Sequence, residues 1–203
     1  MKNLDFKMTQ LSFRDSVELN KKSKTLNTYE FYAYMLDKVT TLDTREINDL
    51  LLQDVYSILI QYLLEQFENP ELASGIFASD FISHEQDYDE KIVKINGYRF
   101  SNTHLTLKRA IEAEKYCYIK RDLSLLNFYL LGSTCLKGLK EGVEAILNTS
   151  DSNTHRELVK ALNNNIGLVS YSKIDLLADL EKVSILDSKN RFISIENEFF
   201  FYT

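Results

Sequence analysis

The stretch INDLLLQDVYSILIQYLLEQF, residues 47–67, decides the fold of this chain. On a helical period of 3.6 residues its polar side chains share one narrow stripe, and almost every other position is Leu, Ile, Val, Tyr or Phe. The stripe consists of Gln53, Asp54, Ser57, Gln61 and Glu65. The apolar face therefore spans more than the ~100° typical of a one-sided surface helix. We expect one long helix that is wrapped by its own chain, by neighbouring subunits, or by both.

The composition favours a folded domain built from long elements. Of the 203 residues, 44% are hydrophobic, and the chain contains only one Pro and six Gly. A net charge of −6 argues against nucleic-acid binding, which depends mainly on Lys and Arg. The short basic spots near Lys21, Lys108 and Lys120 each have acidic neighbours. They indicate solvated helix faces more than a phosphate-binding patch.

The cysteines and the hydrophobic segments predict where the protein resides. Cys117 and Cys135 lie in apolar helical patterns, which is typical of buried thiols in a reducing compartment. Residues 1–10, MKNLDFKMTQ, lack the apolar core of a secretion signal. Residues 123–136 carry no formal charge but are too few to span a bilayer, which takes ~20 residues. We expect a buried helix there, no membrane span, and no secretion through a signal peptide.

The predicted fold class is α+β, mainly α-helical. Asn27 with Glu30 and Asp43 with Glu46 have capping-box spacing, and they predict the starts of a helix over 29–39 and of the long apolar helix. Residues 1–26 are weakly patterned and predict an extended arm or a short strand. The remaining predicted helices cover 70–77, 103–121, 123–147 with a break near Gly132 or Gly138, 154–167 and 172–182. A small-xxx-small pair, Gly138 and Gly142, fits either a tight helix crossing or that local break.

Two β-hairpins are predicted. Asn96-Gly97 between 92–95 and 98–100 supplies the two positive-φ positions of a type I′ turn. Two strands alone are marginally stable, so this hairpin must rest on helices or recruit a third strand. A second hairpin is predicted from 185–186 and 192–195, which flank a turn-like segment. The predicted organisation is an N-terminal arm (1–26), a helical domain (27–182) with an inserted hairpin (92–100), and a C-terminal β and aromatic tail (183–203).

The residues suited to catalysis form no recognisable set. His84, His104 and His155 share no spacing that would place two of them on one helix face. The acidic loop predicted at 79–91 contains His84 and could hold a divalent cation, but it lacks the glycine and alternating ligands of a calcium loop. Neither cysteine has a flanking motif that suggests a base. We therefore predict no catalytic, cofactor-binding or metal-binding residues, no small-molecule substrate, and no enzyme activity.

Glu114 breaks the pattern of its helix, because it lies within the apolar face made by Leu107, Ala110, Ile111, Cys117 and Tyr118. A buried carboxylate must be paired or protonated. Arg121 or a Lys of a neighbouring helix could pair with it. A structural ion pair is favoured, with a catalytic acid and a contact to another subunit as the alternatives.

The tail contains four consecutive aromatic residues, Phe199, Phe200, Phe201 and Tyr202. With both faces apolar, this segment fits a strand buried on both sides or a segment that docks onto another chain. We take these four residues, together with Glu114, as candidate partner contacts.

Residues 26–36, LNTYEFYAYML, followed by residues 46–60, EINDLLLQDVYSILI, resemble the baseplate hub and tail-assembly proteins of contractile-tailed bacteriophages. These proteins are similar in having a short polar-aromatic helix followed by a leucine-rich segment that leads into a long apolar helix. The resemblance covers about residues 25–68. It implies contacts with other protein subunits of a larger assembly, in the host cytoplasm during assembly and in the virion if incorporated, with no cofactor. A small helical enzyme or metal-dependent hydrolase and a helical regulatory adaptor are the alternatives.

Overall fold

The computed structural model describes residues 6–66, 71–73, 76–77, 90, 92–121 and 125–149, together with strands at 173–175, 184–186 and 192–194. The helices are α1 (Phe13–Ser23), α2 (Thr28–Val39), α3 (Thr44–Asp49), α4 (Leu52–Gln66), α5 (Leu107–Lys120), α6 (Leu126–Ser133) and α7 (Leu139–Leu147), with a short 3-10 helix η2 (Asn102–His104). The strands are β1 (Glu71–Ala73), β2 (Ile76–Phe77), β3 (Ile92–Ile95), β4 (Tyr98–Ser101), β5 (Lys173–Asp175), β6 (Ser184–Leu186) and β7 (Phe192–Ser194). The predicted α+β, mainly helical class is confirmed.

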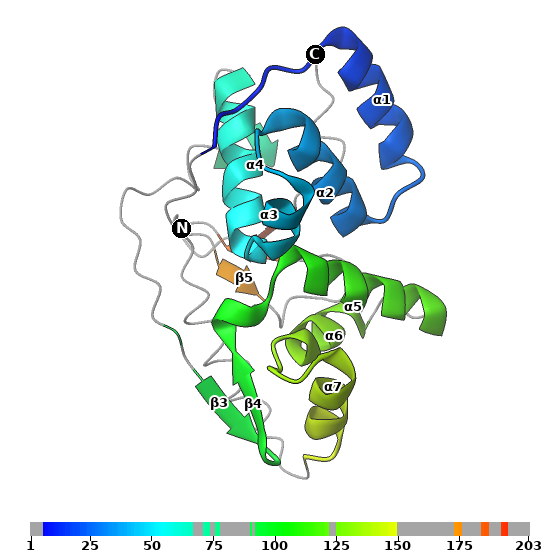
Figure 1. Cartoon of the computed structure of the whole chain (residues 1–203), viewed down its shortest axis with the longest axis vertical. Coiled ribbons are helices and arrows are strands. Elements are labelled where there is room, and N and C mark those ends of the chain that lie inside the picture. The colour runs from blue at the N-terminus through cyan, green and yellow to red at the C-terminus, as the bar shows by residue number, and fades with distance from the viewer. Residues whose placement is uncertain are drawn as a thin grey trace.

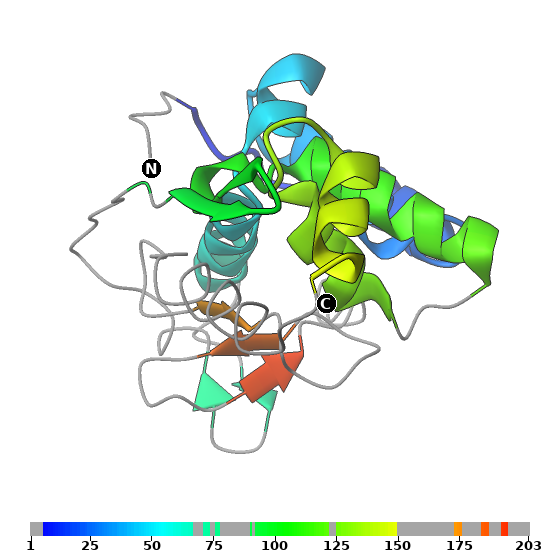
Figure 2. The same ribbon diagram turned by 90° about the horizontal axis from the view of Figure 1, so that it is seen from below.

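The helices form two groups along the long axis of the molecule (Figure 1). Helices α1 to α4 occupy one half, and α6, α7 and the hairpin β3–β4 occupy the other, with α5 lying across between them. In Figure 2 the three-stranded sheet β5–β6–β7 lies along one side of this helical array. Helix α5 packs against α2, α3 and α4 on one side and against α6 on the other. It is therefore the element that joins the two halves.

The long helix predicted over 47–67 is interrupted. Helix α3 ends at Asp49 and α4 begins at Leu52, with Leu50 in an extended conformation between them. The extended connection pairs with the chain that leads into α5, since Leu52 N–H donates to the Leu105 carbonyl and Leu107 N–H donates to the Leu50 carbonyl, both at 2.8 Å. This pairing replaces the helical hydrogen bonds that the break gives up, and Leu50 and Leu52 stay buried.

Helix α4 is buried on nearly all sides within a single chain. Its buried apolar residues are Leu52, Val55, Tyr56, Ile58, Leu59, Ile60, Tyr62 and Leu63. Gln61 and Glu65 of the predicted polar stripe are exposed, but Asp54 is only 4% exposed. Of the three expected ways to cover this segment, the structure shows wrapping by its own chain, and the polar stripe is narrower than predicted.

Residues 13–23 form a helix, so the extended N-terminal arm was a wrong prediction. Ser12 and Asp15 make a reciprocal capping box at the start of α1, and Leu19 anchors the helix in the core. Leu19 is the one fully buried residue of α1, which explains why the apolar period was too weak to predict it. Extended pairing is confined to the segment before the helix, where Met8 bridges Thr40.

The first predicted hairpin is confirmed, and a third segment supports it. Asn96 and Gly97 have φ values of 48° and 80°, as a type I′ turn requires. The connection between α6 and α7 adds to the open edge of β4: Ser101 N–H donates to the Thr134 carbonyl, and Leu136 N–H donates to the Arg99 carbonyl. The hairpin thus both rests on helices and recruits additional pairing.

Helices α6 and α7 are separated where the sequence predicted a break, and they also cross closely. Gly138 precedes α7 with a φ of 137°, a conformation that favours glycine. A Cβ on Gly142 would lie 2.0 Å from the Gly132 carbonyl oxygen, so only a glycine permits this approach. The break and the tight crossing therefore occur together, with Gly132 and not Gly138 opposite Gly142.

Two predicted helices are wrong where the structure describes the chain. Residues 70–77 contribute the antiparallel strands β1 and β2, and residues 173–175 form strand β5. The second hairpin is confirmed as β6–β7, to which β5 adds a third antiparallel strand. The predicted helix over 154–167, most of the acidic loop at 79–91 and the tail over 198–203 lie outside the described residues. The predicted division into an arm, a helical domain and a tail stays a prediction.

Candidate functional site: the buried carboxylate at the start of α2

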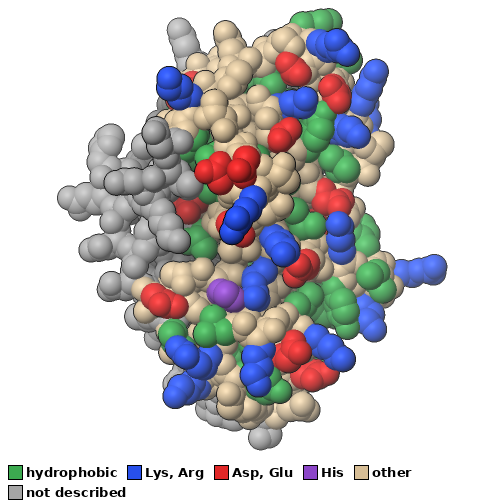
Figure 3. All heavy atoms as spheres, viewed as in Figure 1, with side chains coloured by type: hydrophobic (Ala, Val, Ile, Leu, Met, Phe, Trp, Pro, Cys, Tyr) green, Lys and Arg blue, Asp and Glu red, His purple; other side chains and the backbone are tan. Residues whose placement is uncertain are grey.

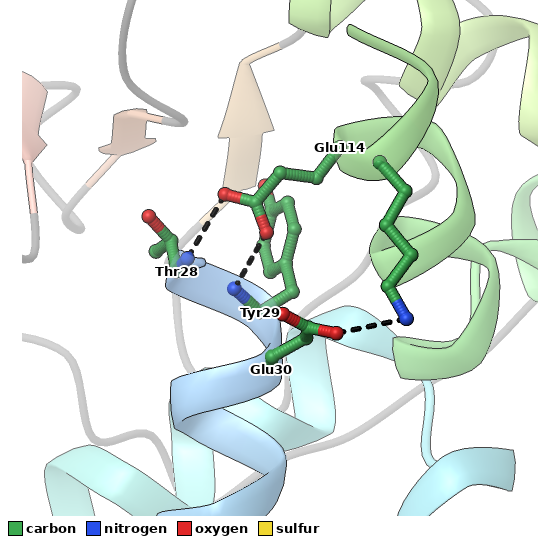
Figure 4. A network of polar contacts seen from close by, with 5 residues as sticks. Thr28, Tyr29, Glu30 and Glu114 are labelled. Atoms are coloured by element: carbon green, nitrogen blue, oxygen red, sulfur yellow. Dashed lines mark hydrogen bonds and ion pairs between the residues drawn. The ribbon is translucent and has the colours of Figure 1, made fainter. Parts of the chain in front are cut away.

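Glu114 is buried at the junction of the two helical groups. Helix α5 begins after Thr106, whose side chain caps it by accepting a hydrogen bond from the Arg109 N–H. The residues of α5 that face the core are Leu107, Ala110, Ala113 and Cys117. Glu114 shares that face and is 2% exposed, which confirms its predicted burial. Its carboxylate meets the first turn of α2 (Figure 4). Oε1 accepts a hydrogen bond from the Thr28 N–H and Oε2 accepts one from the Tyr29 N–H, each at 3.0 Å.

This carboxylate replaces a local cap that the sequence predicted. Asn27 occupies the N-cap position of α2, but its side chain makes no capping hydrogen bond. Glu30 does not complete a capping box; its Oε1 lies 2.8 Å from Lys115 Nζ, the neighbour of Glu114 on α5. The predicted box at Asn27 and Glu30 is therefore wrong. Two adjacent residues of α5 instead hold the first turn of α2.

Burial and hydrogen bonding act in opposite directions on the Glu114 carboxyl. Burial raises its pKa above the ordinary value of 4.5, and the two backbone N–H groups offset part of that rise. The aligned peptide dipoles at the start of α2 also favour negative charge at this point. The carboxylate thus satisfies donors that the helix cannot satisfy itself, at the cost of being removed from water.

Three tyrosines enclose the base of this site. The ring centroids of Tyr29 and Tyr32 lie 6.1 Å apart, and those of Tyr32 and Tyr56 lie 5.8 Å apart, both edge to face. Burial raises the pKa of all three phenols well above 10. The Tyr29 hydroxyl is close enough to Tyr56 for the two phenols to interact electrostatically, yet it makes no hydrogen bond of standard length with a described residue. The aromatic pattern of 29–39 predicted a helix but not this packing against α4.

Arg121, one candidate for the predicted ion pair, does not pair with Glu114, and among the described residues neither does a Lys of a neighbouring helix. Arg121 is exposed and ends α5 in a left-handed conformation with a φ of 56°. Because both Glu114 oxygens accept backbone N–H groups, the geometry suits a structural link better than an acid that transfers a proton to a substrate. The contact of Glu114 with another subunit stays a prediction.

A second polar contact, which the sequence did not predict, lies between α5 and the connection from α6 to α7. Arg109 Nη1 donates to the carbonyls of Ser133 and Cys135, at 2.7 and 2.8 Å, and thereby satisfies the end of α6. Burial lowers the pKa of the Arg109 guanidinium. The one signal in the sequence is an arginine near the apolar face of α5, which does not specify backbone acceptors.

His104 lies near this group, with Glu90 and Ser101. Ser101 Oγ donates to Glu90 Oε1 at 2.9 Å, so its proton points at the carboxylate and not at the imidazole. Burial and the nearby Arg109 charge lower the pKa of His104, while Glu90 raises it. A nucleophilic serine would instead donate to the histidine that acts as its base. This arrangement therefore fits a structural contact that holds Glu90 against the end of β4 better than a nucleophilic site.

The other candidate residues divide between the core and the undescribed segments. Cys117 and Cys135 are both buried, as predicted. His84, His155 and residues 199–202 lie outside the described residues. Across the described ranges, no group of three or more His, Cys, Asp or Glu side chains could hold a metal ion, and no helix is both long and apolar enough to cross a membrane. Comparisons with protein-family models, curated proteins and solved structures found no match to this chain.

Proposed function

We propose that this chain is a structural or assembly protein of a bacteriophage tail or baseplate that acts through protein–protein contacts. The resemblance of residues 26–36 and 46–60 to baseplate hub and tail-assembly proteins supports the phage setting. Those residues fall on α2, α3 and α4, which contribute most of the buried apolar residues of the first half. In this proposal they form a scaffold that presents other surfaces to neighbouring subunits.

The observation that carries the proposal is the exposure of large apolar side chains on helices whose opposite faces are fixed in the core. Phe13 and Val17 of α1 are 86% and 40% exposed, and Ile119 at the end of α5 is 75% exposed. Figure 3 includes hydrophobic side chains at the surface among charges of both signs. Apolar groups held on rigid elements bind partners with little ordering cost, because the helix is already formed. Phe13 and Val17 lie one turn apart and form a small apolar group, which is a feature of contact surfaces.

The tail supplies the contact that we test. Removal of residues 198–203 should abolish incorporation into the assembly and leave the helical core folded. The full-length and truncated chains, each with an N-terminal affinity tag, would be expressed in infected cells, and particles would be separated on a density gradient. Far-UV circular dichroism of both purified chains checks the fold. Lys108→Glu, a substitution at an exposed position of α5, is the matched control and should incorporate normally.

Two outcomes would overturn the proposal. If the truncated chain still co-sediments with particles, the tail is not needed for incorporation. A full-length chain that never co-sediments, and instead travels as a small complex with one partner, would favour the adaptor alternative.

A further inference from the structure

The outward face of α1 has an apolar half and a basic half. Phe13 and Val17, one turn apart, form the apolar half. Lys21 and Lys24 continue the same face and form the basic half, and Arg14 lies beside Phe13. All five side chains are exposed. Lys and Arg side chains line the outer edge of α1, at the upper right of Figure 3.

The acidic residues of α1, Asp15 and Glu18, lie on other sides of the helix than Phe13 and Val17. Asp15 accepts hydrogen bonds from the N–H and the hydroxyl of Ser12 in the capping box. Glu18 accepts one from the Tyr34 hydroxyl, on the side of α1 that faces α2. Each of these contacts lowers the pKa of its carboxyl, which therefore stays ionised at neutral pH. The exposed positions of α1 thus carry positive charge and apolar surface on a helix that is fixed against α2.

We propose that this face binds the C-terminal segment of a second copy of the chain, residues 196–202. The sequence of that segment is ENEFFFY: two glutamates come first, aromatic residues follow, and Lys and Arg are lacking. Acidic and aromatic groups are what a basic and apolar surface selects. Phe13 is 86% exposed, so this surface is open to such an occupant. The inference rests on the proposed function only in taking the tail as a contact segment.

The order of residues in the tail matches the order on the helix. In an extended conformation alternate side chains face one way, which places Glu196, Glu198, Phe200 and Tyr202 on one side. A tail that runs antiparallel to α1 sets the glutamates on the basic half and the aromatic rings on the apolar half. Seven extended residues span roughly 20 Å, and the 11 residues of α1 span roughly 16 Å. The two segments therefore match in length, charge and polarity.

Such a contact joins two different surfaces of the same chain. Repeated head-to-tail contacts close into a ring where the rotation between copies permits it, and otherwise extend into a filament. The inference therefore predicts oligomers larger than a dimer when the concentration is high enough.

The test combines a labelled peptide with charge reversal. Fluorescence anisotropy would measure binding of a synthetic peptide of residues 195–203 to the full chain, and mass photometry would measure self-association. We expect the double variant Lys21→Glu/Lys24→Glu to raise the Kd of the peptide about tenfold or more. A peptide carrying Glu196→Lys and Glu198→Lys should bind that variant and not the wild type. The double variant Lys108→Glu/Lys140→Glu, with the same change in charge at exposed sites on α5 and α7, should bind like the wild type.

The apolar half has its own variant, Phe13→Ser, which should weaken peptide binding without reversing its charge preference. The inference is overturned if the wild-type chain stays monomeric and binds no peptide, if charge reversal leaves binding unchanged, or if only Ile119→Ser removes it. The inference is also overturned if the full chain binds anionic vesicles through α1 and the tail peptide does not displace it from them.

The proposed function can fail separately. Self-association without incorporation into particles supports this inference alone. Tail-dependent incorporation without self-association supports only the proposed function.

Discussion

Helix α3 is capped by its own residues, whereas helix α2 is capped by residues of another helix. In α3, Asp43 Oδ1 accepts the N–H groups of Arg45 and Glu46, and the Glu46 side chain returns to the Asp43 N–H. In α2, the first N–H groups donate to Glu114, which is 86 residues from Thr28. Both helices follow a residue type that commonly serves as an N-cap. The start of α3 therefore depends on one short segment, and the start of α2 depends on the docking of α5.

The difference shows how a helix start can carry long-range stability. A local cap stabilises its helix in the folded chain and also in partly unfolded states. A remote cap acts only after a long loop has closed, so its contribution is tied to the complete fold. Substitutions of the capping residues Glu114, Asp43 and Asn27 test this difference between the two helix starts.

The largest effect should come from Glu114→Ala. The substitution leaves the buried Tyr29 N–H and the partly buried Thr28 N–H without acceptors and leaves a cavity where the side chain was, so we expect the free energy of unfolding to fall by about 3 kcal/mol. Urea unfolding followed by circular dichroism measures this loss. Glu112→Ala, at an exposed position of the same helix, is the control and should change stability by less than ~0.5 kcal/mol. A loss below about 1 kcal/mol for Glu114→Ala would show that water replaces the carboxylate.

The second effect is a pH dependence, measured as the difference in unfolding free energy between the wild type and Glu114→Gln. The folded-state pKa of Glu114 lies above the ordinary 4.5, because burial disfavours the charged form. The contribution of this group is then fully present below pH 4.5 and is lost as the pH rises through the folded-state pKa. The advantage of the wild type over the variant should therefore be larger in acid than at neutral pH. An advantage that grows with rising pH would mean that the backbone donors outweigh burial.

A smaller effect is expected for Asp43→Ala. Removing the local cap of α3 should lower the free energy of unfolding by about 1 kcal/mol. Amide exchange should increase at Arg45 and Glu46 and remain unchanged at Thr28 and Tyr29, because the two caps are separate. Faster exchange at the start of α2 would contradict that separation.

The smallest effect is expected for Asn27→Ala. This residue has the N-cap position of α2, but its side chain makes no capping hydrogen bond, so the change in stability should stay within ~0.5 kcal/mol. The same urea titration measures it, alongside Asp43→Ala. A loss equal to that of Asp43→Ala would mean that Asn27 caps α2 in solution.

Features set by neighbouring residues could be predicted from the sequence. Asn96-Gly97 specified its turn, and Asp43 with Glu46 specified a helix start, because each relies on contacts within a few residues. The burial of Glu114 was predictable for the same reason, since a single carboxylate lay within an apolar face. The partners of Glu114 could not be predicted, because they are backbone N–H groups, which every residue except proline has.

Features that depend on distant pairing could not be predicted. The three leucines at 50–52 are compatible with a continuous helix and also with the extended connection that pairs with Leu105 and Leu107. Helix α1 was missed because its contacts with α2, such as that of Glu18 with Tyr34, involve polar side chains. In the connection at 50–52, the choice was made by a segment far away in the chain, whereas α1 also has a local capping box, Ser12 with Asp15, that the weak apolar period left unnoticed.

The dependence of α2 on Glu114 has a consequence for the growing polypeptide. Synthesis proceeds from the N-terminus, so Thr28 and Tyr29 leave the ribosome long before Glu114 has been made. Until then, α2 lacks the acceptor for its first turn, and both α2 and α4 lack the contacts that α5 makes with them. A nascent chain stalled before Glu114 should therefore hold residues 13–66 in a chaperone-accessible state, and one extended past α5 should not.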